Sequence, residues 1–191
     1  FQLGDEPAAM APDYDDSAWR KLNLPHDWAI EGDFSPHNPS GTGGGALPGG
    51  IGWYRKTFTP DEAWKGKRVV LDFEGVMYVS DVFVNGKKVA SNEYGYTGFE
   101  ADITKVVNYG SDNVVAVYSS TGPTGGSRWY TGGGIFRNVW LKAGNNTRIA
   151  RHGLYVTTEG DKVNVQVQVV GWQRHDIKIK ACVKDADGRV V

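Results

Sequence analysis

The side chains best suited to ligand binding are concentrated between Gly122 and Leu141, in G-P-T-G-G-S-R-W-Y-T-G-G-G-I-F-R-N-V-W-L. Arg128 carries a planar fork of N–H donors, and Trp129 and Tyr130 offer apolar ring faces with polar tips. Such groups suit sugar rings and their hydroxyls, although packing of the loop onto the core would explain the rings equally well. Disordered linkers rarely carry large aromatic residues. We therefore expect an ordered glycine loop, with Arg128, Trp129 and Tyr130 as the substrate-binding candidates.

The spacing of the histidines indicates no metal site. No pair has the i, i+4 or two-residue spacing of metal-binding motifs among the four in the chain, His26, His37, His152 and His175. His26 and Asp27 are adjacent, but neighbours on extended backbone point to opposite faces and cannot form a catalytic dyad. We expect Asp27 or His26 instead to tie the N-terminal segment to the domain.

Other catalytic motifs are missing as well. Ser127 lacks the G-x-S-x-G elbow that activates a serine. The glycine clusters at 41–45 and 132–134 neither open a helix nor precede a Lys-Ser/Thr pair, which argues against a phosphate-binding loop. Carboxylates such as Asp72 and Glu100 have ordinary strand or turn contexts, and sequence cannot place two of them at the separation that glycosidases use. We expect no catalytic residue in this chain.

Composition narrows the class of protein. The chain has 191 residues, of which 26 are glycine and 40% are hydrophobic, and this glycine share is well above the usual ~7%. This glycine content predicts many turns and an all-β fold. The formal net charge of −1 leaves no electrostatic footprint for nucleic acid or anionic lipid. No apolar run approaches the ~18 residues that suggest a membrane span, so neither nucleic acid nor a membrane is an expected partner.

The strands that must position the glycine loop are short and separated by turns. Alternating or continuous apolar patterns predict strands at 53–58, 68–73, 76–85, 87–90, 114–118 and 135–142. Asn85-Gly86 predicts a hairpin turn with positive φ at both residues. Phe1 to Ile30 is expected to lie on the domain as a strap, with a helical turn at 13–19, and another helical turn is expected after Pro60. This pattern favours a jelly-roll β-sandwich.

The composition changes between Ala143 and Arg148, which predicts two domains, 1–145 and 146–191. In the second domain, apolar and polar residues alternate at 163–169 and 177–183, as in strands with one buried face. An immunoglobulin-like β-sandwich needs about seven strands and ~100 residues. We therefore expect only the first strands of such a sandwich, an incomplete domain that pairs with a copy of itself or leaves its tail mobile.

Six segments of the sequence, in order, resemble the amino-terminal domain of glycoside hydrolase family 2, most of all its β-galactosidases. They are L-P-H-D-W from Leu24, G-W-Y-R-K-T-F from Gly52, L-D-F-E-G-V from Leu71, D-V-F-V-N-G from Asp81, Y-T-G-F-E-A-D-I-T from Tyr96 and S-R-W-Y-T-G-G-G-I-F-R-N-V-W-L from Ser127. The β-glucuronidases and β-mannosidases of the family share this domain.

The resemblance implies a jelly-roll sugar-binding-type domain, an immunoglobulin-like sandwich and then a (β/α)₈ barrel that carries both catalytic glutamates of a retaining hydrolase. The barrel is absent here, so the chain alone is expected to be inactive. Arg128 is the implied substrate contact, with Trp129 and Tyr130 positioning it. Arg128 stands where some relatives have an Asp that binds galactose and sodium, and the magnesium site lies mainly on the barrel, so no cofactor is expected in this chain.

The resemblance also implies the partners. They are the chain's own downstream barrel and a β-galactoside or related glycan, with further copies of the protein in a homo-oligomer as a third candidate. A periplasmic or secreted bacterial location is favoured over a cytoplasmic one. Two alternatives remain open at this point: a self-sufficient carbohydrate-binding module, in which Trp129→Ala abolishes sugar binding, and a fragment of a β-glucuronidase or β-mannosidase relative.

Overall fold

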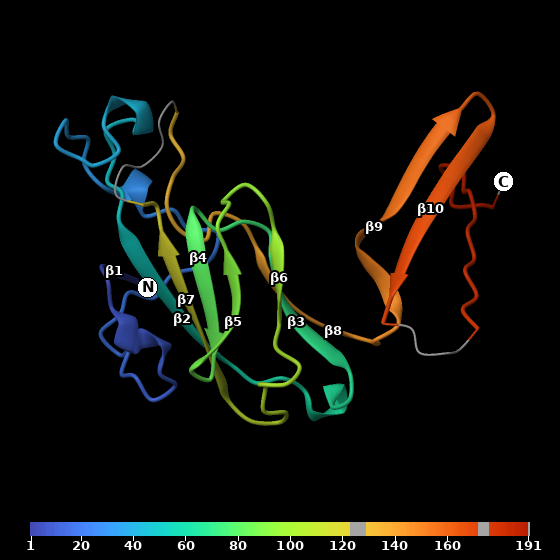
Figure 1. Cartoon of the computed structure of the whole chain (residues 1–191), viewed down its shortest axis with the longest axis horizontal. Helices are drawn as coiled ribbons and strands as arrows, with labels where there is room; N and C mark the ends of the chain where they lie inside the picture. Colours follow the sequence, from blue (N-terminus) through green and yellow to red (C-terminus); the bar gives the residue numbers. More distant parts are fainter. Residues whose placement is uncertain (123–128, 172–175, 191) are drawn as a thin grey trace. The chain divides into compact units, whose positions relative to one another are not determined.

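The computed structural model describes residues 1–122, 129–171 and 176–190. The chain forms two compact units, Phe1–Ala143 and Gly144–Val191. Strands dominate both units, and the helical elements of the described residues are single turns of 3₁₀-helix. The predicted all-β fold is confirmed (Figure 1).

Two antiparallel sheets make up the first unit. The larger sheet has the order β1-β2-β7-β4-β5 and the smaller one the order β6-β3-β8. The strands are β1 (Gln2–Leu3), β2 (Ile51–Phe58), β3 (Arg68–Phe73), β4 (Val79–Val84), β5 (Lys87–Asn92), β6 (Phe99–Asp102), β7 (Asn113–Ser120) and β8 (Val139–Gly144). Inward side chains of both sheets, among them Phe73 of β3 and Val82 of β4, form one buried cluster. The unit is therefore a β-sandwich.

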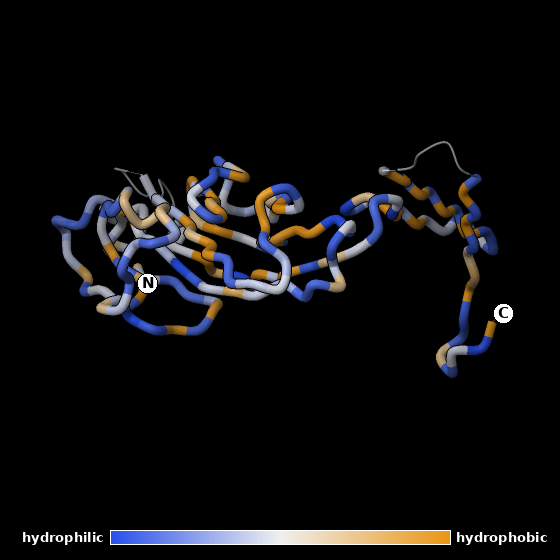
Figure 2. Tube along the Cα trace, turned by 90° about the horizontal axis from the view of Figure 1, so that it is seen from below, coloured by the Kyte–Doolittle hydropathy of each residue, from blue (hydrophilic) through white to orange (hydrophobic). Residues whose placement is uncertain are grey.

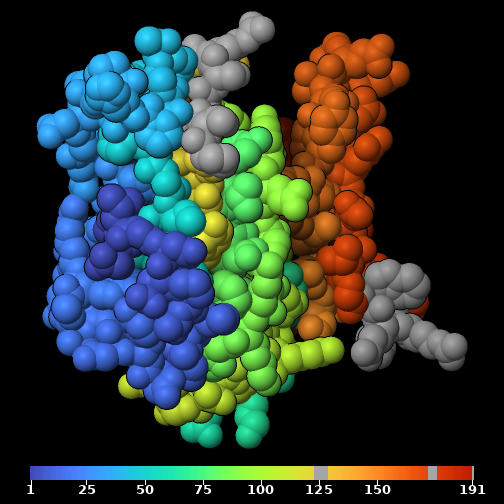
Figure 3. Space-filling view, turned by 60° about the vertical axis from the view of Figure 1, so that its left-hand side comes forward, coloured from blue at the N-terminus to red at the C-terminus, as the bar shows by residue number. Residues whose placement is uncertain are grey.

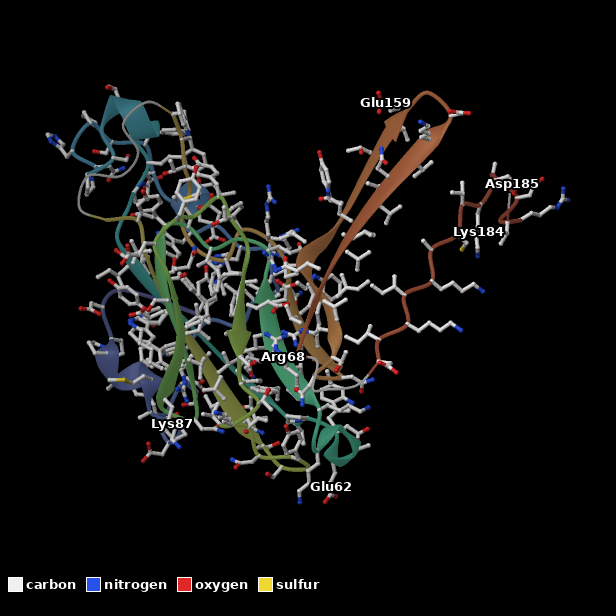
Figure 4. All side chains as sticks on the ribbon, turned by 45° about the vertical axis from the view of Figure 1, so that its right-hand side comes forward. Glu62, Arg68, Lys87, Glu159, Lys184 and Asp185 are labelled. Atoms are coloured by element: carbon white, nitrogen blue, oxygen red, sulfur yellow. The ribbon has the colours of Figure 1, made fainter. Side chains whose placement is uncertain are left out.

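Local sequence patterns place several elements correctly. The predicted strand at 68–73 is β3. Asn85 and Gly86 have φ angles of 51° and 77°, which confirms the predicted turn between β4 and β5, and Lys87 marks its end in Figure 4. The helical turn expected after Pro60 is the 3₁₀-helix η4 (Glu62–Trp64). In these segments the local pattern of apolar and turn-forming residues is sufficient to place the element.

Two predicted strand boundaries are wrong. The strand expected from Val76 begins at Val79 as β4, and the strand expected from Ile135 begins at Val139 as β8. The cause is a pairing outside both sheets, in which Met77 and Gly134 form an isolated antiparallel bridge. The backbone of these residues joins two loops to each other instead of extending the strands.

The N-terminal segment is a strap, as predicted. Arg55 of β2 points into it with a side chain that is only 3% exposed, and donates hydrogen bonds to the carbonyls of Ala9, Ala11 and Tyr14. Its Nε also donates to Asp16 at 2.9 Å. Figure 3 shows the strap, in blue, lying against strands coloured green and yellow. One guanidinium group thus fixes much of the strap on the sheet.

The helical turn predicted at 13–19 is wrong. These residues form turns, in which Asp15 accepts from the backbone N–H of Ser17 at 3.0 Å. The strap's helical turn comes earlier, as the 3₁₀-helix η1 (Pro7–Met10). Two further 3₁₀-helices, η2 (Ala29–Glu31) and η3 (Thr42–Gly44), lie in the connection to β2. Among the described residues there is no helix long and apolar enough to cross a membrane.

The second unit contains one hairpin, formed by β9 (Arg148–Glu159) and β10 (Lys162–Val170). β10 confirms the strand predicted at 163–169, and its alternation of hydrophobic and hydrophilic residues is visible in Figure 2. The strand predicted at 177–183 is wrong, because these residues pair with no strand in the described part of the chain. A turn follows at Asp185, labelled in Figure 4, where the backbone N–H of Gly188 donates to its carbonyl.

Candidate functional site

The predicted binding loop is described from Trp129 onward. Arg128 lies outside the described residues, so its predicted contact with substrate stays a prediction. Trp129 and Tyr130 have exposed fractions of 61% and 38%. The segment that carries them follows β7 in the chain and lies at the end of the first unit where β2 begins (Figure 1).

Asp27 connects the strap to this loop. Its Oδ1 accepts from the backbone N–H groups of Ala29 at 2.9 Å and Gly133 at 2.8 Å, and its Oδ2 accepts from the hydroxyl of Tyr130. Gly132 has a φ of +78°, and a Cβ there would lie 2.4 Å from Asp27 Oδ2. The carboxylate therefore needs both a tyrosine and glycines in the loop, and the predicted tying role of Asp27 is confirmed.

His26 ties the same segments together on the buried side. Its Nδ1 lies 2.7 Å from the hydroxyl of Tyr54, and the backbone N–H of Ile135 donates to the same hydroxyl oxygen at 3.4 Å. The backbone N–H of His26 donates to the carbonyl of Ile135 at 2.8 Å. Burial raises the pKa of Tyr54, so this phenol stays protonated at neutral pH. His26 and Asp27 thus bind different partners, as expected for neighbours that do not form a dyad.

Tyr130 lies where the two glycine-rich loops meet. A Cβ added to Gly45 would approach its Cδ2 to 3.9 Å, which is an ordinary van der Waals contact. Burial and the hydrogen bond to Asp27 raise the pKa of the Tyr130 hydroxyl. The hydroxyl is therefore a neutral donor over the physiological pH range, and the ring is held between the loop at 41–45 and the strap.

Trp129 belongs to a group of aromatic side chains. Its Nε1 donates to the hydroxyl of Tyr96 at 2.9 Å, and the ring of Tyr96 lies 5.6 Å from that of Tyr94, centroid to centroid. Sequence reasoning did not single out Tyr94 and Tyr96 as site residues. The available signal was Y-G-Y-T-G from Tyr94, which combines aromatic residues and glycine as the binding loop does.

Met77 anchors both loops that carry these rings. Its backbone exchanges hydrogen bonds with Gly134, at 2.8 and 3.0 Å, and the hydroxyl of Ser119 donates to its carbonyl at 2.6 Å. A Cβ added to Gly95 would lie 2.4 Å from its Sδ. The turn between Tyr94 and Tyr96 therefore rests on the same buried side chain whose backbone holds the binding loop.

The ion pair of Arg20 and Glu31 lies next to the imidazole of His26. Both terminal nitrogens of Arg20 donate to Glu31, each at 2.6 Å, and Glu31 Oε2 lies 3.4 Å from His26 Nε2. The hydrogen bonds from Arg20 lower the pKa of Glu31 from its ordinary 4.5 to about 2. A carboxyl group whose pKa falls on folding stabilises the folded state when ionised.

We expect this contribution of Glu31 to be complete above about pH 4.5 and to disappear as the pH falls through about 2. Thermal unfolding of the native chain and Glu31→Gln between pH 7 and pH 2 measures it, with Glu93→Gln at an exposed position as the control. The difference in unfolding free energy should be at most ~1 kcal/mol at pH 7, because the pair faces solvent. A difference that grows toward pH 2 contradicts this assignment.

The described residues contain no group of three or more His, Cys, Asp and Glu side chains that could hold a metal ion. A cavity of about 610 Å³ lies between the strap and the open side of the sandwich. Its lining is mainly apolar, including Phe1, Leu22, Leu71 and Val117, and among the described residues Asp16 is its one carboxylate. A single carboxylate cannot form the pair that glycoside hydrolysis needs, and Asp16 is in addition bound to Arg55.

Comparison with known proteins gives consistent matches. The family model described as "Glycosyl hydrolases family 2, sugar binding domain" matches residues 46–144. The chain is 46% identical to the β-galactosidase BoGH2A of Bacteroides ovatus, over 100% of this chain and 23% of that protein. It is 34% identical to a putative β-glucuronidase of Formosa agariphila, over 100% of this chain and 19% of that protein.

Solved structures agree with these relatives. A β-glycosidase from Bacteroides vulgatus superposes with a TM-score of 0.90 at 36% identity, over 98% of this chain and 25% of that one. A glycosyl hydrolase family 2 member from Bacteroides cellulosilyticus gives a TM-score of 0.88 at 36% identity, over 98% of this chain and 26% of that one. The chain therefore spans about a quarter or less of the length of the proteins that it matches.

Proposed function

Because the chain belongs to glycoside hydrolase family 2, we propose that it is the non-catalytic amino-terminal part of a β-galactosidase-like hydrolase, in which it supplies scaffold and part of the active-site rim. The observation that carries this proposal is the loop at 129–134, which displays Trp129 and Tyr130 at one end of the sandwich and is held by Asp27 through Tyr130 and Gly133. A loop fixed in this way can meet a neighbouring domain without being reordered.

The chemistry is proposed to reside in a (β/α)₈ barrel that follows this chain. A retaining glycosidase uses two carboxyl groups about 5 to 5.5 Å apart, one as acid/base and one as nucleophile. The carboxylates that we describe around the loop serve other contacts: Asp27 accepts from Tyr130 and Gly133, and Glu31 accepts from Arg20. In our proposal this chain positions substrate and narrows access of water, and the barrel breaks the bond.

Each candidate residue then has a defined task. Trp129 and Tyr130 border the sugar, and Arg128 supplies N–H donors to its hydroxyls. We propose that the hairpin of β9 and β10 begins an immunoglobulin-like sandwich between the sugar-binding domain and the barrel. Magnesium or sodium, which enzymes of this kind often use, would be held by the barrel and not by this chain.

A β-galactoside is the proposed substrate because the relative matched at 46% identity is a β-galactosidase, whereas the putative β-glucuronidase is matched at 34%. The test uses the protein extended beyond Val191 to include the barrel. We expect its kcat/KM for a chromogenic β-galactoside to exceed that for the corresponding β-glucuronide and β-mannoside at least ~100-fold, because a site built for one sugar's polar groups rejects the others. A preference for the glucuronide would contradict the proposal.

A further inference from the structure

Three exposed aromatic side chains form a group that we term the aromatic bracket: Tyr94, Tyr96 and Trp129. Their exposed fractions are 53%, 44% and 61%. The ring planes of Tyr94 and Tyr96 are inclined by 59° to each other, so they face different directions and can touch two sugar rings. The hydrogen bond from Trp129 Nε1 to Tyr96 joins the third ring to this pair.

The bracket is held in place by its own surroundings. The carbonyl of Tyr94 accepts from the side chain of Asn92 at 2.7 Å and from that of Thr97 at 3.4 Å. Gly95 rests on the buried Met77. Rings on a fixed backbone lose little conformational freedom when a ligand arrives, so more of the contact energy appears as affinity.

The chemistry of the bracket fits a neutral sugar chain. Tyrosine and tryptophan combine an apolar face, which matches the C–H face of a pyranose, with a polar tip that can bond to hydroxyls. Between Asn92 and Gly98 the sequence carries a single charged side chain, Glu93, and a carboxylate disfavours an anionic ligand such as a uronic acid chain. The neighbouring tilted rings of Tyr94 and Tyr96 also favour a chain of sugars over one monosaccharide.

We propose that Tyr94 and Tyr96 of the aromatic bracket form a second carbohydrate subsite beside Trp129, which binds a neutral β-linked oligosaccharide through sugar units beyond the one that Trp129 borders. This inference rests on the proposed function and specifies its substrate class, a β-galactoside carried on a longer sugar chain. Tyr94 and Tyr96 contact sugar directly, and the hydrogen bond to Tyr96 orients Trp129.

The test is titration calorimetry of the 191-residue chain with β-1,4-galactotetraose and with galactose as probes. We expect the tetraose to bind more tightly than galactose. Tyr94→Ala and Tyr96→Ala should each weaken tetraose binding roughly three- to tenfold, the range of a single aromatic contact. Tyr96→Phe keeps the ring and should lose less. Tyr155→Ala, at a tyrosine of β9 that is 62% exposed, is the matched control and should leave binding unchanged.

Two results would overturn the subsite: no binding of the tetraose at ~10 mM, a concentration at which even weak sites are occupied, or equal weakening by Tyr94→Ala, Tyr96→Ala and Tyr155→Ala. A second measurement separates failure of the subsite from failure of the proposed function. It is hydrolysis, by the extended protein, of a chromogenic β-galactoside that contains one sugar. Turnover of this substrate without binding of the tetraose would contradict only the proposed subsite. Binding of the tetraose without turnover would contradict only the proposed function.

Discussion

Replacing Asp27 with alanine is expected to lower kcat/KM for a chromogenic β-galactoside about 100-fold in the protein that contains both this chain and the barrel, because displacement of a positioning group by about 1 Å can cost this much. Asp27 accepts three hydrogen bonds, from Ala29, Gly133 and Tyr130. Alanine leaves two backbone N–H groups and one hydroxyl without their acceptor. The loop then loses its side-chain attachment to the strap and keeps only backbone hydrogen bonds such as that from His26 to Ile135, so Tyr130 loses its fixed position.

Two matched variants separate positioning from general destabilisation. Tyr130→Phe removes only the hydroxyl that donates to Asp27 and should give a smaller loss. Asp27→Asn keeps an oxygen that can accept from Ala29 and Gly133 and should restore most of the activity. Thermal unfolding of each variant shows whether the domain remains folded. If Asp27→Ala keeps full kcat/KM while folded, the loop does not form part of the active-site rim.

Replacing Arg55 with methionine is expected to lower the free energy of unfolding by about 3 to 5 kcal/mol, because several part-buried strap carbonyls lose their donor at ~1 to 3 kcal/mol each. The guanidinium is 3% exposed and bonds to Asp16 and to carbonyls of the strap. Methionine has a similar length but no donors. The strap carbonyls then remain buried without partners, and the strap should detach from β2.

Urea unfolding of the 191-residue chain measures this loss. Arg68→Met is the control, since Arg68 also bridges two carboxylates, Glu100 and Asp102, each at 2.9 Å, but lies on the outer surface of β3 and β6 with 16% of its side chain exposed (Figure 4). A more solvated arginine should contribute less, roughly 1 kcal/mol. If Arg55→Met costs no more than Arg68→Met, the strap is not held by Arg55.

The parts of the fold that sequence predicted correctly are those determined by neighbouring residues. Between Arg68 and Phe73 the apolar residues Val69, Val70, Leu71 and Phe73 predict a strand, and this segment is β3. Asn85-Gly86 specifies a turn by its positive φ angles, and the flanking strands follow from it. In such segments intrinsic preference and tertiary structure agree.

Predictions failed where distant residues decide the local structure. The strand expected from Val76 is interrupted because Met77 pairs with Gly134, 57 positions along the chain. Alternation at 177–183 gives a strand only if another strand pairs with it, and the described chain supplies none. Periodicity shows that a segment can form a strand, but it does not supply the partner.

The candidate site shows the same division. The residue types of the glycine loop and the tying role of Asp27 could be read from sequence, because glycine, aromatic and carboxylate chemistry is local. The partner of Asp27 could not, since Tyr130 is 103 positions away. The contact between Trp129 and Tyr96, 33 positions apart, was missed for the same reason. These residues come together only because the folded sandwich places their loops at the same end of the domain.

Turnover of a chromogenic β-galactoside, measured side by side for the 191-residue chain and for the protein extended beyond Val191 through the proposed barrel, tests whether this chain is the non-catalytic part of the enzyme. We expect hydrolysis by the extended protein and none by the chain, because the proposal places both catalytic glutamates in the barrel. Hydrolysis by the chain itself, or none by the folded extended protein, would contradict the assignment of this chain as the non-catalytic part of a β-galactosidase-like enzyme.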